Sequence, residues 1–290
     1  MDLTRSFLKS KSPCTDGFRW FIRKFSDGSR YQELLDALVA DGRVTDACWV
    51  LDQFGPTDEV REVDEIDTEA MVFAGSLRVR GNVEAGQLLR VGGSLRAGGG
   101  IRAAGDLLVG DDLRSGGSVQ VGGRLEAGGH LRTDWGVSVR GDLLCHGDAR
   151  VGWELLCGGR LRCTGNLQVG EDIQGDGEID CGKGVHAGGS LQAAASVRAG
   201  HGIVAGSSIH CALHLEAGWG IKAGELIEAG GAIRAGESLQ AGEGIRAGEG
   251  YGVFAGLDVQ LASWETSARV CAPHKPHGLM SGWWAGPSPC

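Results

Sequence analysis

Five arginines recur at intervals of eighteen residues through the first half of a glycine-rich segment, at Arg78, Arg96, Arg114, Arg132 and Arg150. A guanidinium group is permanently charged and carries a planar fork of N–H donors that fits carboxylates and phosphates. If residues eighteen apart are neighbours in space, these five side chains form a column. Such a column is suited to recognising an acidic protein or a phosphate-rich ligand.

A second interpretation of the column is a lattice of screened surface ion pairs, each contributing little to stability. Asp112, His130 and Asp148 precede three of the arginines by two residues and are expected on the same side of the chain. Ser76 and Ser94 leave Arg78 and Arg96 without such a partner. Trp135 and Trp153 share a neighbouring column, where they either stack on each other or form a small exposed apolar patch.

Cysteine and histidine are the other residue types that can carry chemistry. Five cysteines occupy positions that elsewhere hold Ala or Val, which predicts buried thiols that act as small hydrophobes; these are Cys145, Cys157, Cys163, Cys181 and Cys211. Neighbouring thiols of this kind lie within disulfide range, so oxidation in vitro is possible. Near the end of the chain, Cys271, His274 and His277 can ligate zinc, but their spacing fits no standard site. We expect no metal and no cofactor.

A six-residue repeat positions these columns. From Leu77 to Ile245 every sixth residue is Leu, Ile or Val, with the single exception of Ala149, and a mostly small residue follows two positions later. In a strand, residues i and i+2 share one face, so both point inward and the polar residue between them points outward. Glycine pairs such as Gly92-Gly93 are expected to turn the chain through positive φ angles.

The predicted fold is mainly β, a single-stranded triangular parallel β-helix of about 18 residues per coil, with a small N-terminal α-helical module. Successive coils would stack about 4.8 Å apart through parallel hydrogen bonds. Residues 77–249 then form a rod roughly 45 Å long. A single coil cannot bury its own apolar face, so stability comes from stacking and both ends need caps.

The pattern [LIV]-x-[AVC]-G-x-x over residues 77–249 resembles the hexapeptide-repeat β-helix families. The chain is closest in character to the bactofilins, which are right-handed polymer-forming cytoskeletal proteins. It is also similar to the left-handed acyltransferases, which use a histidine base and a loop that encloses the acyl donor. The repeat here contains no insertion that could supply such a loop, and an uninterrupted prism offers no water-excluding pocket. We therefore expect no enzymatic activity and rank acyltransferase activity below the non-catalytic functions.

The flanking segments differ from the repeat. We predict a small helical module over 1–57, with helices from Tyr31 to Val39 and from Val44 to Phe54, and leave its role open between an N-terminal cap and a partner-docking module. An acidic linker is predicted over 58–75, the solenoid over 76–262, and a C-terminal cap or flexible tail over 263–290.

Composition narrows the class of protein further. The 290 residues include 52 Gly but 6 Pro, which excludes collagen. A net charge of −9 argues against non-specific nucleic-acid binding. The sequence has neither a run of about 18 apolar residues, so no membrane span is expected, nor a signal peptide. Nine Cys then favour a reducing compartment, and we expect the cytoplasm.

Charge is also unequal along the repeat. Residues 76–132 carry an excess of arginine, whereas residues 214–250 carry an excess of glutamate. A rod with a basic and an acidic end can associate with itself, head to tail or laterally. We therefore expect a non-catalytic scaffold protein that self-assembles like a bactofilin. The alternative is an interaction module, of the inhibitor or immunity type, that binds one protein partner.

Overall fold

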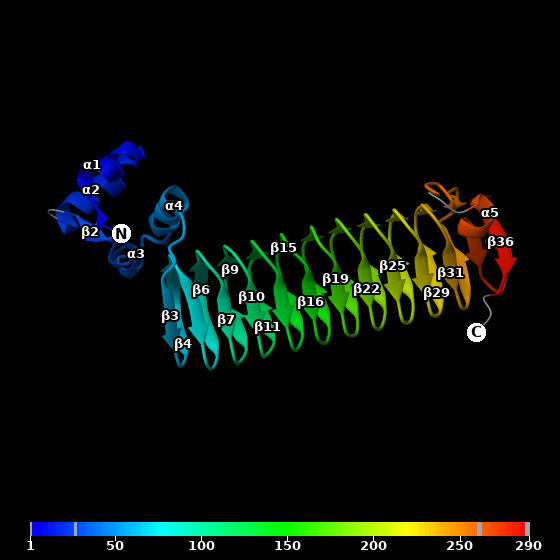
Figure 1. Ribbon diagram of the computed structural model, residues 1–290, viewed down its shortest axis with the longest axis horizontal. Coiled ribbons are helices and arrows are strands. Elements are labelled where there is room, and N and C mark those ends of the chain that lie inside the picture. The colour runs from blue at the N-terminus through cyan, green and yellow to red at the C-terminus, as the bar shows by residue number, and fades with distance from the viewer. Residues whose placement is uncertain (1, 26–27, 260–262, 288–290) are drawn as a thin grey trace.

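The chain forms a straight rod of stacked β coils with a group of helices at its N-terminal end (Figure 1). This computed structural model describes residues 2–25, 28–259 and 263–287. Each coil contributes three short strands, and all strands of the rod pair in parallel. We call the three sides of the rod the first, second and third faces. Among the described residues, no helix is long and apolar enough to cross a membrane.

The first face is a 13-stranded sheet in the part of the chain that the structure describes. Its strands, in order along the rod, are β3 (Val60–Val63), β5 (Ser76–Val79), β7 (Leu95–Ala97), β10 (Leu113–Ser115), β13 (Leu131–Thr133), β16 (Ala149–Val151), β19 (Leu167–Val169), β22 (Val185–Ala187), β25 (Ile203–Ala205), β28 (Ile221–Ala223), β31 (Leu239–Ala241), β34 (Arg269–Cys271) and β36 (Trp283–Gly286).

Two long strands, β4 (Ile66–Phe73) and β6 (Val83–Val91), bend around one corner and join the other two faces into one sheet. The second face continues through β8 (Ile101–Ala103), β11 (Val119–Val121), β14 (Val137–Val139), β17 (Leu155–Cys157), β20 (Ile173–Gly175), β23 (Leu191–Ala193), β26 (Ile209–Cys211), β29 (Leu226–Ala229) and β32 (Gly244–Arg246). The third face continues through β9 (Asp106–Val109), β12 (Leu125–Ala127), β15 (Leu143–Cys145), β18 (Leu161–Cys163), β21 (Ile179–Cys181), β24 (Val197–Ala199), β27 (Leu215–Ala217), β30 (Ile233–Ala235), β33 (Val253–Phe254) and β35 (Leu279–Ser281).

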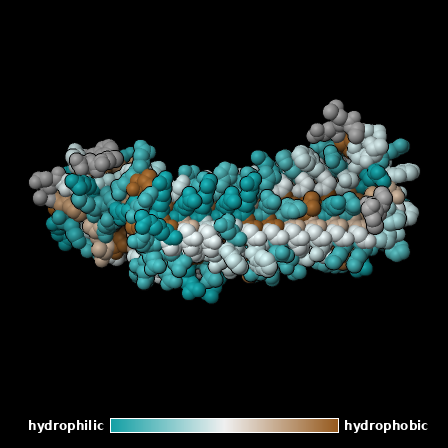
Figure 2. Space-filling view, turned by 60° about the horizontal axis from the view of Figure 1, so that its bottom comes forward, coloured by the Kyte–Doolittle hydropathy of each residue, from teal (hydrophilic) through white to brown (hydrophobic). Residues whose placement is uncertain are grey.

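The strand register confirms the predicted coil of 18 residues. Leu113 pairs with Leu131, and Arg114 with Arg132, across adjacent coils. The aliphatic and small positions point inward and form one continuous buried core along the rod. The residues between them face solvent, so side chains eighteen apart line up in straight rows on the surface (Figure 2).

The turn glycines are selected for a different reason from the one predicted. Positive φ angles are found at eight glycines among the described residues, and Gly92, Gly93, Gly98 and Gly99 are not among them. A Cβ on Gly98 would instead lie 2.2 Å from the carbonyl oxygen of Arg80 in the preceding coil. Close approach between stacked coils, and not left-handed backbone, favours glycine at these corners.

The described part of the N-terminal module holds four helices, α1 (Arg5–Ser10), α2 (Thr15–Lys24), α3 (Tyr31–Ala40) and α4 (Val44–Phe54). The last two confirm the helices predicted from the pattern. A short antiparallel pair, β1 (Asp2–Leu3) with β2 (Ser29–Arg30), ties the start of the chain to the start of α3. The module has its own small core, which extends onto Val72 and Ala74 of the first coil.

The first coil begins earlier than the sequence suggested. The segment predicted as an acidic linker over 58–75 holds β3 and β4, which pair with β5 and β6. Its acidic residues occupy outward positions. Because of this acidic composition, the segment was predicted to be a linker and not part of the repeat. Arg61 takes an inward aliphatic position, and its guanidinium lies 4.5 Å from the ring centroid of buried Phe73, where it covers the end of the core.

A glutamine side chain closes part of the N-terminal sheet edge. The Gln32 amide on α3 donates to the Val72 carbonyl at 2.9 Å and accepts from the Ala74 N–H at 2.9 Å. It therefore supplies the two bonds that a further strand would make. An ion pair between Arg90 of β6 and Asp52 of α4 adds a second link between module and solenoid.

The C-terminal end is built differently. Residues 263–287 contain a short helix, α5 (Trp264–Ser267), followed by β34, β35 and β36, which extend the first and third faces. The register shifts at Val253/Phe254 and at Val270/Cys271, so the last coil departs from the regular repeat. Met280, Trp283 and Trp284 on the final strands remain exposed.

Candidate binding surface

The five predicted arginines form one unbroken row on the first face, and we call this row the arginine column. Arg78, Arg96, Arg114, Arg132 and Arg150 lie on the consecutive strands β5, β7, β10, β13 and β16 and pair directly in the register. All five side chains are exposed. Like charges on directly opposed positions of adjacent strands repel each other, so this row costs stability unless an anion compensates.

Compensating carboxylates reach only part of the column. Glu62 on β3 stands at the head of the row, and its Oε1 lies 3.0 Å from Nη1 of Arg78. Arg78 was expected to lack a partner on its own strand, and it pairs instead with Glu62 on the neighbouring strand β3. Asp112 approaches Arg114 at 3.8 Å, the long limit of an ion pair. No carboxylate of the described residues lies within ion-pair distance of Arg96, Arg132 or Arg150.

The other predicted counter-groups serve the backbone instead. The Asp112 carboxylate accepts the His130 N–H at 2.8 Å, and His130 Nδ1 accepts the Asp148 N–H at 2.9 Å. Asp148 in turn accepts the Asn166 N–H at 2.8 Å, and this donation holds the pKa of Asp148 below its usual value. The side chains before the strands thus form a corner ladder that satisfies the amides of the next coil.

Two exposed tryptophans flank the arginine column. Trp135 follows β13 and Trp153 follows β16, the strands that carry Arg132 and Arg150. Their exposed fractions are 62% and 53%, which favours the predicted apolar patch. Tryptophan and arginine are the residue types most enriched among the residues that dominate protein–protein binding.

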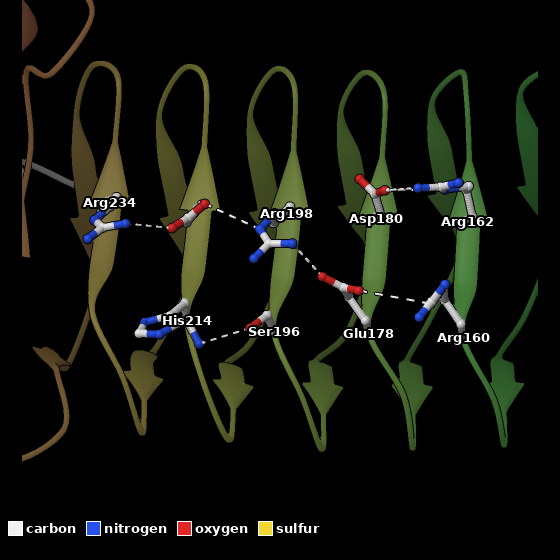
Figure 3. A network of polar contacts seen from close by, with 9 residues as sticks. Arg160, Arg162, Glu178, Asp180, Ser196, Arg198, His214 and Arg234 are labelled. Atoms are coloured by element: carbon white, nitrogen blue, oxygen red, sulfur yellow. Dashed lines mark hydrogen bonds and ion pairs between the residues drawn. The ribbon is translucent and has the colours of Figure 1, made fainter.

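The third face carries an alternating ladder of opposite charges (Figure 3). We define it by Arg160, Arg162, Glu178, Asp180, Arg198, Glu216 and Arg234. Arg198 is its centre, at 2.5 Å from Glu178 and 3.4 Å from Glu216. Glu216 also reaches Arg234 at 2.9 Å, and Arg162 reaches Asp180 at 3.1 Å. The charges of this ladder satisfy one another.

The stacked cysteines lie in the core, as their positions predict. Cys145, Cys163 and Cys181 are buried on β15, β18 and β21, directly behind the third face. The Cys163 thiol donates to the Gly147 carbonyl at 3.1 Å. Burial raises the pKa of Cys211 to about 12 and also raises the pKa of Cys157. The raised pKa keeps the Cys211 and Cys157 thiols protonated at neutral pH, which makes them poor nucleophiles and poor ligands.

Three histidines of the solenoid make contacts on its surface. His214 accepts the Ala232 N–H at 3.1 Å, His201 stacks on Trp219 with ring centroids 4.1 Å apart, and His210 lies 3.2 Å from Glu228. Near the C-terminus, Cys271 is buried on β34. Within the described ranges, no three His, Cys, Asp or Glu side chains gather as a metal site would require.

One family model matches part of the chain. Residues 1–54 match the YdhT N-terminal domain, and the match ends at the last residue of α4. It therefore covers the helical module and none of the solenoid. No curated protein matches the chain, and no solved structure matches it.

Proposed function

We propose that the chain is a non-catalytic scaffold protein that binds an acidic protein partner along the arginine column. The observation that carries this proposal is the contrast in charge pairing: Arg96, Arg132 and Arg150 are exposed and lack a carboxylate among the described residues, while the arginines of the alternating ladder are paired. Trp135 and Trp153 would supply apolar anchors beside the charges.

The non-catalytic part of the proposal is supported by the contacts of three solenoid histidines and by the open surface around them. An acyltransferase of this architecture would need a histidine free to act as a base in an enclosed site. His214 is bonded to the next coil, and His201 is covered on one face by Trp219. His210 faces an open surface of the second face, where it pairs with Glu228. We also propose a cytoplasmic location, in keeping with the eight described cysteines, which are all free thiols.

A defined acidic polymer tests the binding proposal. Fluorescein-labelled poly-L-glutamate titrated with the full chain should give saturable anisotropy at 50 mM salt, and the affinity should fall steeply toward 1 M salt as the charges are screened. The proposal fails if poly-L-glutamate does not bind at 50 mM salt, or if its affinity is unchanged at 1 M salt.

A second candidate is self-assembly in the manner of bactofilins. The arginine-rich 76–132 and glutamate-rich 214–250 segments favour association between copies. Coil-on-coil stacking meets an obstacle at the N-terminal end, where the Gln32 amide occupies the edge of β4. Lateral contact is therefore the form we favour for this candidate. Sedimentation velocity at 50 mM salt separates the two functions, because a monomer at high concentration excludes assembly and leaves partner binding.

A further inference from the structure

The helical module encloses a cavity that the proposed function does not use. It has a volume of about 190 Å³ and lies between the four helices. Its floor is buried and apolar, formed by Leu8, Trp20, Phe21, Leu34, Leu38 and Val50. Its rim includes the exposed Cys14 and Thr45 and the partly exposed Gly17, Asp46 and Trp49, which mark the opening to solvent.

The volume of this cavity suits a single planar ring system. An engineered apolar cavity of about 150 Å³ stays dry and binds benzene. The cavity here is slightly larger, and the side chains of Trp20, Phe21 and Trp49 give it aromatic walls. Offset and edge-to-face contacts with such walls favour an aromatic guest over an aliphatic one of equal size.

Gly17 is a second observation in favour of a site. It lies inside α2 without a positive φ, so alanine would be the more favourable residue there by helix propensity. A Cβ at this position would sit 3.1 Å from Sγ of Cys14, the thiol that caps α2, and 3.8 Å from Asp46 Oδ2 across the rim. A methyl group there would meet the capping thiol and end at the rim, whereas a longer side chain would extend across the opening.

The polar edge of the cavity is an acceptor. Arg43 binds Asp46 at 2.5 Å and 2.6 Å, and both contacts fall on Oδ2, which leaves Oδ1 available. The same guanidinium also binds Asp16 at 2.8 Å. Among the residues that line the cavity, Asp46 is the one with a charged side chain. It favours an N–H donor and disfavours a carboxylate on the guest.

We infer that the helical module binds a small neutral aromatic molecule with an N–H donor, of the size and chemistry of indole, with the ring between Trp20, Phe21 and Trp49 and the N–H directed to Asp46. This inference is independent of the arginine column, which lies on the first face of the solenoid. Either function can fail without the other.

Indole is the probe for the experiment. Titration of the full chain, followed by calorimetry and by NMR shifts of the tryptophan ring N–H signals, should give one site with a dissociation constant of about 0.1 mM or lower. Gly17→Leu should abolish binding because the side chain fills the rim. Gly17→Ala, whose methyl group ends at the rim, is the matched control and should retain binding within about threefold.

The Asp46 contact has its own test. Asp46→Asn should weaken indole by about tenfold but leave 1-methylindole, which has no N–H, unchanged, since a hydrogen bond to a charged acceptor is lost only in the first case. Absence of saturable indole binding to the wild-type chain overturns the site. Equal binding by Gly17→Leu and wild type, with both folded by circular dichroism, also overturns it. An equal effect of Asp46→Asn on both probes removes Asp46 from the proposal.

Discussion

The arginine column and the alternating ladder are built from the same repeat on two faces of one rod. Both present outward residues on consecutive parallel strands, at the same spacing and on the same kind of buried core. On the third face the charges alternate, so that Arg198 binds Glu178 and Glu216. On the first face five arginines follow one another, and the carboxylates of the described residues approach Arg78 and Arg114 but not the other three.

The difference shows that the solenoid itself does not require an unpaired column. Because the backbone fixes only the inward residues, the outward ones are free to alternate in sign, and the third face uses that freedom. A row of like charges on the first face is therefore the arrangement that stability alone disfavours. Its retention is what we attribute to binding.

The largest expected effect comes from disrupting the buried core that supports both the arginine column and the alternating ladder. Ile173→Asp would bury an unpaired carboxylate at a fully buried position of the second face. We expect a loss of about 4 kcal/mol or more in the free energy of unfolding of the affected coils, measured by urea denaturation. Gln174→Asp, on the adjacent outward position, is the control and should change stability little. A small effect of Ile173→Asp would contradict the buried core.

The next effect separates the inner thiols from the outer charges. Arginines stay charged up to pH 11, whereas burial raises the pKa of Cys211 to about 12. This pKa is above that of a thiol in the unfolded chain. The buried thiol's contribution to the free energy of unfolding is therefore complete below about pH 8.5 and is lost as the pH rises toward 12. Between pH 9 and 11 the slope should approach about 1.4 kcal/mol per pH unit for this thiol. Cys211→Ala should flatten the decline relative to wild type, while exposed Cys14→Ala should not.

Replacing an arginine with glutamate should change stability in opposite directions in the arginine column and in the alternating ladder. Arg198→Glu would place a third acid between Glu178 and Glu216, and we expect a loss of about 1 kcal/mol. Arg114→Glu would instead create an alternating sequence with Arg96 and Arg132, and it should raise stability by a few tenths of a kcal/mol. Thermal unfolding at 20 mM salt measures both. The comparison breaks if both substitutions shift the midpoint in the same direction, or if 1 M salt leaves either shift unchanged.

The sequence was sufficient to predict the size of the coil, because the spacing of the inward aliphatic residues determines which residues pair between adjacent coils. Leu113 and Leu131 are neighbours once eighteen residues close a coil, and the placement of the arginine column followed from that. It was insufficient at the ends. Arg61 occupies an inward position that the pattern reserves for an aliphatic residue, so the first coil was read as a linker.

The counter-charges of the column were also partly mispredicted. Two residues on one strand face were assumed to pair with each other, but Asp148 accepts a backbone N–H from the next coil. An amide at a corner lacks a backbone acceptor, and satisfying it outweighs an exposed ion pair. The cavity beneath Gly17 left no signal in the sequence, because it depends on how four helices pack.

Two triple variants matched in charge test the central claim most directly. Arg114→Gln/Arg132→Gln/Arg150→Gln removes three positive charges from the arginine column, and Arg162→Gln/Arg198→Gln/Arg234→Gln removes three from the alternating ladder. Binding of labelled poly-L-glutamate at 50 mM salt, with folding checked by circular dichroism, should weaken at least tenfold in the first variant and less than about twofold in the second. Equal weakening in both, or none in the first, would contradict the account.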